Sequence, residues 1–384
     1  AKIYYFCAMR FLTADYLFTL YTTPIKEGVL QISDDGKVIS VFKNRMEVNQ
    51  NQLEIFEGIL CPGFVNAHCH LELSHLKGSA KKGKGFLEFS KTIRLRDNYS
   101  DTAKKQAIEE AEKEMISNGI VAVGDICNKV DTLEKKQKEN LTYYNFIETF
   151  GVDLNNTDVV FNQAIELRNE FRVAGQKASI VPHSPYSVPP VLMNKIINAF
   201  DNADELLTIH MQETNEENQL FENQEGAFFD WLNSMNATSS IWLNRNKPTD
   251  VLQDLSDKKV LLVHNTFARK EDITDNYYCT CPRANLYIEN DLPDYSIFDS
   301  DKLCVGTDSL ASNDSLSILD ELLIIQNNSN FDLNTLLKIA CKNGAKALGF
   351  SKLGTFRNGK IPGVNLIKNL DGFKFTADCF IQVI

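Results

Sequence analysis

The sequence predicts an α/β protein: a (β/α)8 TIM-like barrel joined to a small β-sandwich that is built from both chain ends. Eight short apolar runs rich in β-branched residues alternate with amphipathic stretches. The runs are continuously apolar, which is typical of strands buried on both faces of a parallel sheet. Eight such strands alternating with helices favour a barrel over a doubly wound sheet.

The predicted strands follow one another along the middle of the chain. They cover residues 64–68, 120–126, 143–150, 178–184, 206–213, 259–266, 277–282 and 303–309. Between the first two, residues 102–118 place apolar side chains at three- and four-residue steps, and Gly119 supplies the stop, so we expect a helix there. Residues 316–327 and 333–348 show similar apolar spacing, so we expect helices there as well. The longest gaps, after the first and the fifth run, predict extended loops or lids.

The two ends of the chain do not follow the barrel pattern. Residues 28–42 contain two strand-like runs joined through Asp34, Asp35 and Gly36, which is a strong hairpin signal. The tail after Leu353 is strand-like again. We therefore predict a composite β-sandwich from residues 1–60 and 353–384, with the barrel over residues 61–352.

Composition narrows the class of protein. Forty basic and fifty-one acidic residues give a net charge of -11, which argues against a nucleic-acid partner. Apolar runs stay well short of the ~20 residues that a membrane helix needs, and the N-terminal residues lack a signal-peptide pattern. The nine cysteines show no disulfide framework. We expect a cytoplasmic protein with reduced thiols and no membrane partner, and leave a homo-oligomer open.

Histidines gather where the apolar runs end. Five of the six histidines, with one aspartate, occupy these positions: His68, His70, His183, His210, His264 and Asp308. In a (β/α)8 barrel the strand ends converge on one face, and residues two apart in extended backbone point the same way. The pattern therefore predicts a metal site. His75 lies in a loop and fits a solvent or substrate-channel role better.

Three imidazoles and a carboxylate suit one divalent ion, Zn²⁺ first, with Fe²⁺ as an alternative. Such an ion lowers the pKa of a bound water toward about 7. Glu213 follows His210 by three residues, and a carboxylate beside the ion can move protons. A surface glutamate at the start of the next helix is the other interpretation of Glu213.

These motifs, in this order, resemble the amidohydrolase superfamily, in particular its deaminase and chlorohydrolase branch. The resemblance is carried by residues 62–72 (PGFVNAHCHLE), 182–187 (PHSPYS), 210–217 (HMQETNEE), 262–266 (LVHNT), 281–288 (CPRANLYI) and 305–313 (VGTDSLASN). Both chain ends also resemble the flanking sandwich strands of that superfamily. The resemblance therefore covers nearly the whole chain.

The resemblance implies a role for each residue. The implied metal ligands are His68, His70, His210 and Asp308. Glu213 would shuttle protons, His264 would orient or help activate the attacking water, and Asp308 would also accept a proton from that water. The fourth strand has Lys177 only at its start, so a lysine that bridges two ions is missing and one ion is expected.

The implied reaction is hydrolytic deamination of an amino-substituted heterocycle: a purine, a pyrimidine or a nucleoside-like molecule. His183 would contact this substrate, and Arg94 and Arg283 are further candidate contacts. Arg94 belongs to a basic stretch over residues 77–96, which either binds an anionic group of the substrate or is a solvated loop. The aromatic residues Phe228, Phe229 and Trp231 either line an apolar pocket or pack on the barrel.

Alternative functions stay open on the same scaffold. One is a chlorohydrolase, and another is an imidazolone-type hydrolase of ring C–N bonds. A non-catalytic degenerate barrel is the most remote alternative, because such a protein should have lost metal ligands, and all the implied metal ligands are present here.

Overall fold

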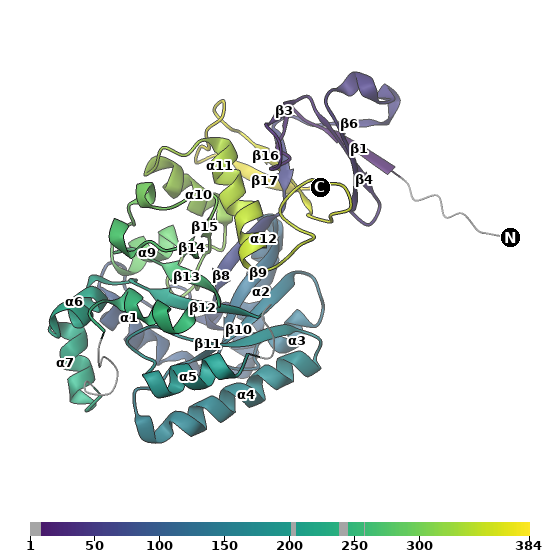
Figure 1. Ribbon diagram of the computed structural model, residues 1–384. Helices are drawn as coiled ribbons and strands as arrows, with labels where there is room; N and C mark the ends of the chain where they lie inside the picture. The colour runs from purple at the N-terminus through teal and green to yellow at the C-terminus, as the bar shows by residue number, and fades with distance from the viewer. Residues whose placement is uncertain (1–8, 201–204, 238–244, 257) are drawn as a thin grey trace.

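The computed structural model describes residues 9–200, 205–237, 245–256 and 258–384, and eight parallel strands form its centre (Figure 1). The first four pair in sequence order as one sheet: β8 (Phe64–Cys69), β9 (Ile120–Cys127), β10 (Thr142–Thr149) and β11 (Lys177–Pro182). The next four form a second sheet: β12 (Leu206–Met211), β13 (Lys259–His264), β14 (Tyr277–Thr280) and β15 (Leu303–Val305). All eight were predicted from the apolar runs.

Backbone hydrogen bonds join the two sheets along both seams. Between β11 and β12, the His210 amide donates to the His183 carbonyl at 2.8 Å. Between β15 and β8, the amides of Thr307 and Asp308 both donate to the His68 carbonyl at 3.1 Å. The strands therefore form one ring, and the predicted (β/α)8 fold class is confirmed.

Helices cover the outside of this ring. They include α2 (Asp101–Ser117), α3 (Leu133–Lys136), α4 (Thr157–Val173), α5 (Pro190–Asn198), α9 (Pro282–Ile288) and α10 (Ile318–Asn327). Helix α2 begins where the Ser100 side chain caps the amide of Ala103, and it ends before Gly119, whose φ is +75°. It buries Ile108, Ala111 and Met115 on the barrel, as its periodicity predicted.

One predicted helix differs in detail. Residues 333–348 form α11 (Leu333–Leu337), a π-helical turn (Lys338–Asn343) and α12 (Gly344–Ala347) instead of one regular helix. A Cβ atom at Gly344 would lie 3.0 Å from the Val65 side chain, so this segment packs closely on β8. The apolar period alone does not reveal such a wide turn.

Strands from both chain ends form two further sheets. One contains β5 (Val38–Phe42), β4 (Val29–Ser33), β1 (Met9–Thr13) and β6 (Leu53–Ile55); the other contains β17 (Phe380–Val383), β16 (Val364–Lys368), β7 (Ile59–Pro62), β2 (Tyr16–Leu17) and β3 (Ile25–Lys26). The antiparallel pairing of β4 with β5 is the hairpin expected at residues 28–42. The second sheet unites the two ends of the chain, while the domain boundaries stay a prediction.

The two long gaps contain short helices at one end of the barrel (Figure 1). After β8 come the 3-10 segments η3 (Leu71–Leu76) and η4 (Arg96–Asn98) with α1 (Phe86–Ile93) between them; after β12 come α6 (Asn215–Asn223) and α7 (Ala227–Ser234). Within the described ranges, no helix combines the length and apolar character that crossing a bilayer requires. The eight cysteines in those ranges are free thiols.

Candidate active site

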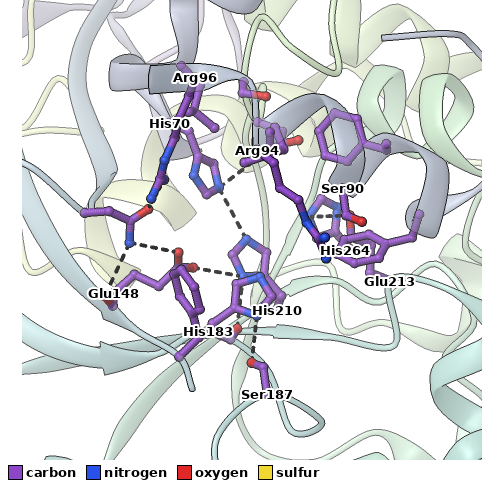
Figure 2. A pocket seen from close by; sticks show the side chains of 18 of the residues that line it. His70, Ser90, Arg94, Arg96, Glu148, His183, Ser187, His210, Glu213 and His264 are labelled. Carbon is purple, nitrogen blue, oxygen red and sulfur yellow. Dashed lines mark hydrogen bonds and ion pairs between the residues drawn. The ribbon is translucent and has the colours of Figure 1, made fainter. Parts of the chain in front are cut away.

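Most of the predicted site residues meet in one cavity at the carboxyl ends of the barrel strands. The cavity has a volume of about 300 Å³. Its lining includes His70, His183, His210, His264, Glu213 and Asp308 (Figure 2). His68 lies directly beneath, since its side chain is 1% exposed and its Nε2 atom is 3.1 Å from His70 Nε2.

Four ligand atoms surround one point at the base of the cavity. His210 Nε2 lies 3.4 Å from His70 Nε2 and 3.3 Å from His68 Nε2. Asp308 Oδ1 lies 3.4 Å from His68 Nε2 and 3.3 Å from His70 Nε2. Two ligand atoms that bind one metal ion at roughly 2.0–2.1 Å in tetrahedral coordination lie about 3.3–3.4 Å from each other. The spacing of these side chains therefore fits a divalent metal ion.

The protonation of these groups also fits a cation. His210 Nδ1 donates to the His183 carbonyl at 3.0 Å, so its Nε2 presents a lone pair to the cluster. Burial lowers the pKa of His70 to about 3 and also lowers the pKa of His68. Burial alone would raise the pKa of Asp308, but the hydrogen bond with His68 and the nearby imidazoles lower it overall. Neutral imidazoles and an ionised carboxylate are the forms that bind metals.

The backbone is left-handed at three positions around the cluster. The φ angles are +48° at Gln212, +68° at His264 and +55° at Asp308. Non-glycine residues rarely adopt this conformation, and such strain gathers at functional sites. Asp308 is held further by the Ser312 hydroxyl, which donates to its Oδ2 atom and leaves Oδ1 toward the histidines.

Glu213 and His264 form one wall of the cavity. His264 Nδ1 donates to Asn285 Oδ1 at 2.9 Å, and its Nε2 lies 3.7 Å from Glu213 Oε1. Glu213 precedes α6 and is 5% exposed, so the structure does not support the alternative of a surface glutamate. Burial, followed by the charges of Asp308 and Glu289, raises the pKa of Glu213 well above its usual value. Glu213 can therefore hold a proton.

His183 lines the cavity beside the cluster. Its Nδ1 atom pairs with the Ser187 hydroxyl at 2.8 Å and the Ser184 hydroxyl at 3.0 Å, which fixes the ring. The ring centroids of His183 and His210 are 4.9 Å apart. His183 thus stands next to His210, and it is grouped with His210 and Glu148 and not with His68, His70 or Asp308.

The two candidate arginines lie in different places. Arg94 follows α1 and lines the cavity, with its side chain extending toward Glu213 and His264 in Figure 2. Arg283 is absent from the described cavity lining, so the lining gives its predicted substrate contact no support. Its Nε atom donates to Asn313 Oδ1 at 2.8 Å, and Asp320 lies 3.4 Å from its Nη1 atom. These two contacts hold the Arg283 guanidinium beside α10.

Sequence reasoning missed several side chains that shape the cavity. Phe86, Phe89, Ser90 and Ile93 from α1, Asn128 after β9, Glu148 from β10, and Phe150 and Tyr186 all contribute to the lining. The sequence could have indicated Glu148, because it is an acidic residue near the end of an otherwise apolar run. Burial raises its pKa to about 8.

The structure also shows where the aromatic residues after β12 and the loop histidine His75 lie, whose roles the sequence left open. Trp231 lines the cavity, while Phe228 is buried behind it against Phe86 and Tyr186, with ring centroids 5.7 and 4.9 Å apart. His75 lies outside the lining, with its Nε2 atom 3.1 Å from the Arg96 carbonyl oxygen.

Comparison with known proteins relates this geometry to a family. The sequence pattern of the amidohydrolase family matches residues 59–380. An aminodeoxyfutalosine deaminase of Nitratiruptor sp. is 26% identical over 344 residues, which cover 85% of this chain and 83% of that protein. An adenosine deaminase of Helicobacter pylori is 28% identical over 313 residues, which cover 78% and 76%.

A solved structure shows the same fold. The Helicobacter pylori aminofutalosine deaminase in complex with methylthio-coformycin superposes with a TM-score of 0.79 at 24% sequence identity. The match covers 96% of this chain and 93% of that one. The eight-stranded architecture is therefore shared along almost the full length of both chains.

Proposed function

The chain belongs to the amidohydrolase family, and from this premise we propose that it is a metal-dependent hydrolytic deaminase of purine-nucleoside-like substrates. The observation that carries the proposal is the meeting of four metal-type ligand atoms with a buried, protonatable glutamate in one cavity. The names of the two curated relatives, an aminodeoxyfutalosine and an adenosine deaminase, favour deamination over dechlorination.

The metal would be held by the Nε2 atoms of His68, His70 and His210 and by Asp308 Oδ1. A divalent cation bound there supplies Lewis-acid activation of a water molecule at neutral pH. Three nitrogens and one carboxylate oxygen suit zinc, with iron second.

One ion per chain fits the ligand supply better than two. Among the described residues, two further groups of possible ligands overlap the first one: His264 joins His68 and Asp308, which already belong to it, and Glu148 and His183 join His210. His210 Nδ1 is engaged with the His183 carbonyl and His210 Nε2 belongs to the first cluster, so only two side chains remain. Lys177 begins β11 at the end opposite His183, so it cannot bridge two ions in this cavity.

Glu213 is the proton carrier in the proposed reaction. It delivers a proton to the ring nitrogen beside the carbon that bears the amino group, which makes that carbon more electrophilic. His264, held by Asn285, orients the attacking water through Nε2, and Asp308 accepts a proton from that water. Asp308 passes this proton to the amino group, which leaves as ammonia when the C–N bond breaks, and the second proton of the water returns to Glu213. Glu213 and Asp308 thus divide the acid and base roles.

The remaining cavity walls suit a planar heterocycle with a substituent. Phe86, Phe89 and Trp231 offer apolar surface, and His183 and Arg94 offer polar contacts to the bound molecule. We assign His183 and Arg94 to substrate binding on this basis.

His183→Ala should lower kcat/KM at least tenfold and leave the metal content unchanged. The imidazole contacts substrate in this proposal and is not one of the four side chains that would hold the metal. Steady-state kinetics and metal analysis of the same preparation check this. Loss of the metal together with activity would move His183 into the ligand set.

Ammonia release tests the proposed function directly. The metal-loaded protein is offered adenosine, 5′-deoxyadenosine, guanine, cytosine and a chlorinated triazine, and ammonia and chloride are both measured. We expect ammonia from one or more of the purine nucleosides and no chloride. Chloride release without ammonia would instead establish the chlorohydrolase alternative.

A further inference from the structure

The His70 imidazole is held differently from the other histidines of the cavity. The His210 ring is fixed at Nδ1 by the His183 carbonyl. The His264 ring is fixed at Nδ1 by Asn285. In the described part of the chain, every hydrogen bond of the His70 ring runs through Nε2, the atom that faces the ligand cluster. The direction of the His70 imidazole therefore depends on the position of its backbone.

Strand pairing does not reach this part of the backbone. Strand β8 ends at Cys69, and Leu71 begins the 3-10 segment η3. An N–H group at the start of a helical segment has no partner inside that segment. His70 precedes η3 as its N-cap residue, but its side chain makes no capping hydrogen bond. The Leu71 amide therefore needs an acceptor from another part of the chain.

Asp125 of β9 supplies this acceptor. The Leu71 amide donates to Asp125 Oδ1 at 2.8 Å, which leaves the His70 imidazole to the ligand cluster. The next residue is tied to the same strand end, because Glu72 Oε2 accepts from the Asn128 amide at 2.9 Å. The backbone that follows His70 is therefore pinned to the end of β9.

Lys136 holds the other oxygen of the Asp125 carboxylate. The Lys136 ammonium, at the end of α3, donates to Asp125 Oδ2. Its other two N–H groups have acceptors in Asn145 Oδ1 at 2.7 Å and Cys127 Sγ at 3.1 Å. All three ammonium donors are used, so the carboxylate cannot turn Oδ1 away from Leu71 without breaking its ion pair.

Stability alone does not explain why this ion pair is buried. The side chains of Asp125 and Lys136 are both 0% exposed. The ring centroids of Tyr143 and Phe171 lie 5.0 and 5.3 Å from Lys136 Nζ. Taking two charges out of water is costly, and apolar residues often replace a buried pair without loss of stability. What the pair supplies instead is a fixed acceptor beside His70.

We propose that the buried Asp125–Lys136 pair positions the metal ligand His70 by fixing the Leu71 amide. This assignment rests on the metal site of the proposed function and deepens it. Asp125 belongs to none of the possible ligand groups among the described residues, so it acts through the backbone as a positioning residue.

Two double variants remove both buried charges and differ only in the acceptor that they leave. Asp125→Asn/Lys136→Met keeps a side-chain oxygen for the Leu71 amide, whereas Asp125→Leu/Lys136→Met keeps the shape and removes the acceptor. The Kd of Co²⁺ and the visible spectrum of the Co²⁺-saturated protein are measured with the chelator-treated full chain. We expect the Leu variant to bind Co²⁺ about 10–100-fold more weakly than wild type, with an altered spectrum. The Asn variant should stay within about threefold of the wild-type Kd and keep the wild-type spectrum.

An exposed ion pair on the same helix is the matched control. Lys105 Nζ lies 2.8 Å from Glu134 Oε2, and both side chains are mostly exposed. Glu134→Leu/Lys105→Met should bind Co²⁺ as wild type does, because exposed ion pairs contribute little. Asp125→Ala/Lys136→Met also lacks the acceptor and should behave as the Leu variant, so the comparison does not depend on one replacement side chain.

Equal Kd values and spectra in the Asn and Leu variants would overturn the positioning role, whether both match wild type or both are weakened. Thermal unfolding of the metal-free proteins shows which variants are folded. Failure of both acceptor-free variants to fold, while the Asn variant folds, would show that Asp125 serves the fold and not His70. Absence of Co²⁺ binding by wild type would instead refute the metal site of the proposed function.

Discussion

Glu213→Gln should reduce kcat by 10²–10⁴-fold or more and leave the metal content and the fold unchanged. General acid–base catalysis typically contributes a factor of this size, which corresponds to roughly 3–5 kcal/mol. The amide keeps the shape of the side chain but cannot carry a proton at neutral pH. Glu213 belongs to none of the possible ligand groups among the described residues, so its replacement removes no ligand. Single-turnover kinetics and metal analysis check the prediction.

A second glutamate provides the control for this experiment. Glu222 lies on α6 but is exposed and pairs with Arg269 at the surface. Glu222→Gln should keep turnover within about twofold of wild type, because exposed ion pairs contribute little. A Glu213→Gln protein within threefold of wild-type turnover would show that another group, such as Asp308 with His264, moves the proton.

His68→Ala should abolish turnover and lower metal affinity by more than about 100-fold, since loss of a mere outer hydrogen-bond partner already costs 10–100-fold. His68 Nε2 lies within 3.4 Å of the three other ligand atoms, so its removal takes away the ligand that all three adjoin. Asp308→Ala should act in the same direction through loss of Oδ1. Metal titration of the chelator-treated proteins measures both effects.

His75→Ala is the matched control, because it deletes an imidazole that lies outside the cavity lining. This variant should bind the metal as wild type does. Full metal content in both His68→Ala and Asp308→Ala would refute the ligand set. Thermal unfolding of the metal-free proteins separates loss of a ligand from loss of the fold.

The barrel and the metal cluster were predictable because both follow from local patterns. The continuous apolar runs located the eight strands, and polar residues at their ends marked the place where strand ends of a barrel meet. The H-x-H spacing of His68 and His70 survives folding because it depends on one strand alone. Because the strand ends converge, the structure also brings together residues as distant in sequence as His70 and Asp308.

The rest of the cavity depends on contacts that no local pattern encodes. The position of α1 over the site follows from how the long segment after β8 folds back, so Phe86 and Phe89 were not singled out. Arg283 lies in the first turn of α9, near a strand end, and the pattern therefore suggested a site residue. Its hydrogen-bond partners Asn313 and Asp320 are 30 and 37 residues away in the sequence, and they hold the Arg283 guanidinium outside the cavity lining.

The central claim is hydrolytic deamination at the histidine–aspartate cluster, and isotope tracing in ¹⁸O-labelled water tests it most directly. Adenosine is incubated with the metal-loaded and the metal-free protein, and product mass and ammonia are measured together. We predict one labelled oxygen in the product for each ammonia released, and only with the metal-loaded protein. Equal turnover by the metal-free protein, or ammonia without incorporation of label, would contradict the account.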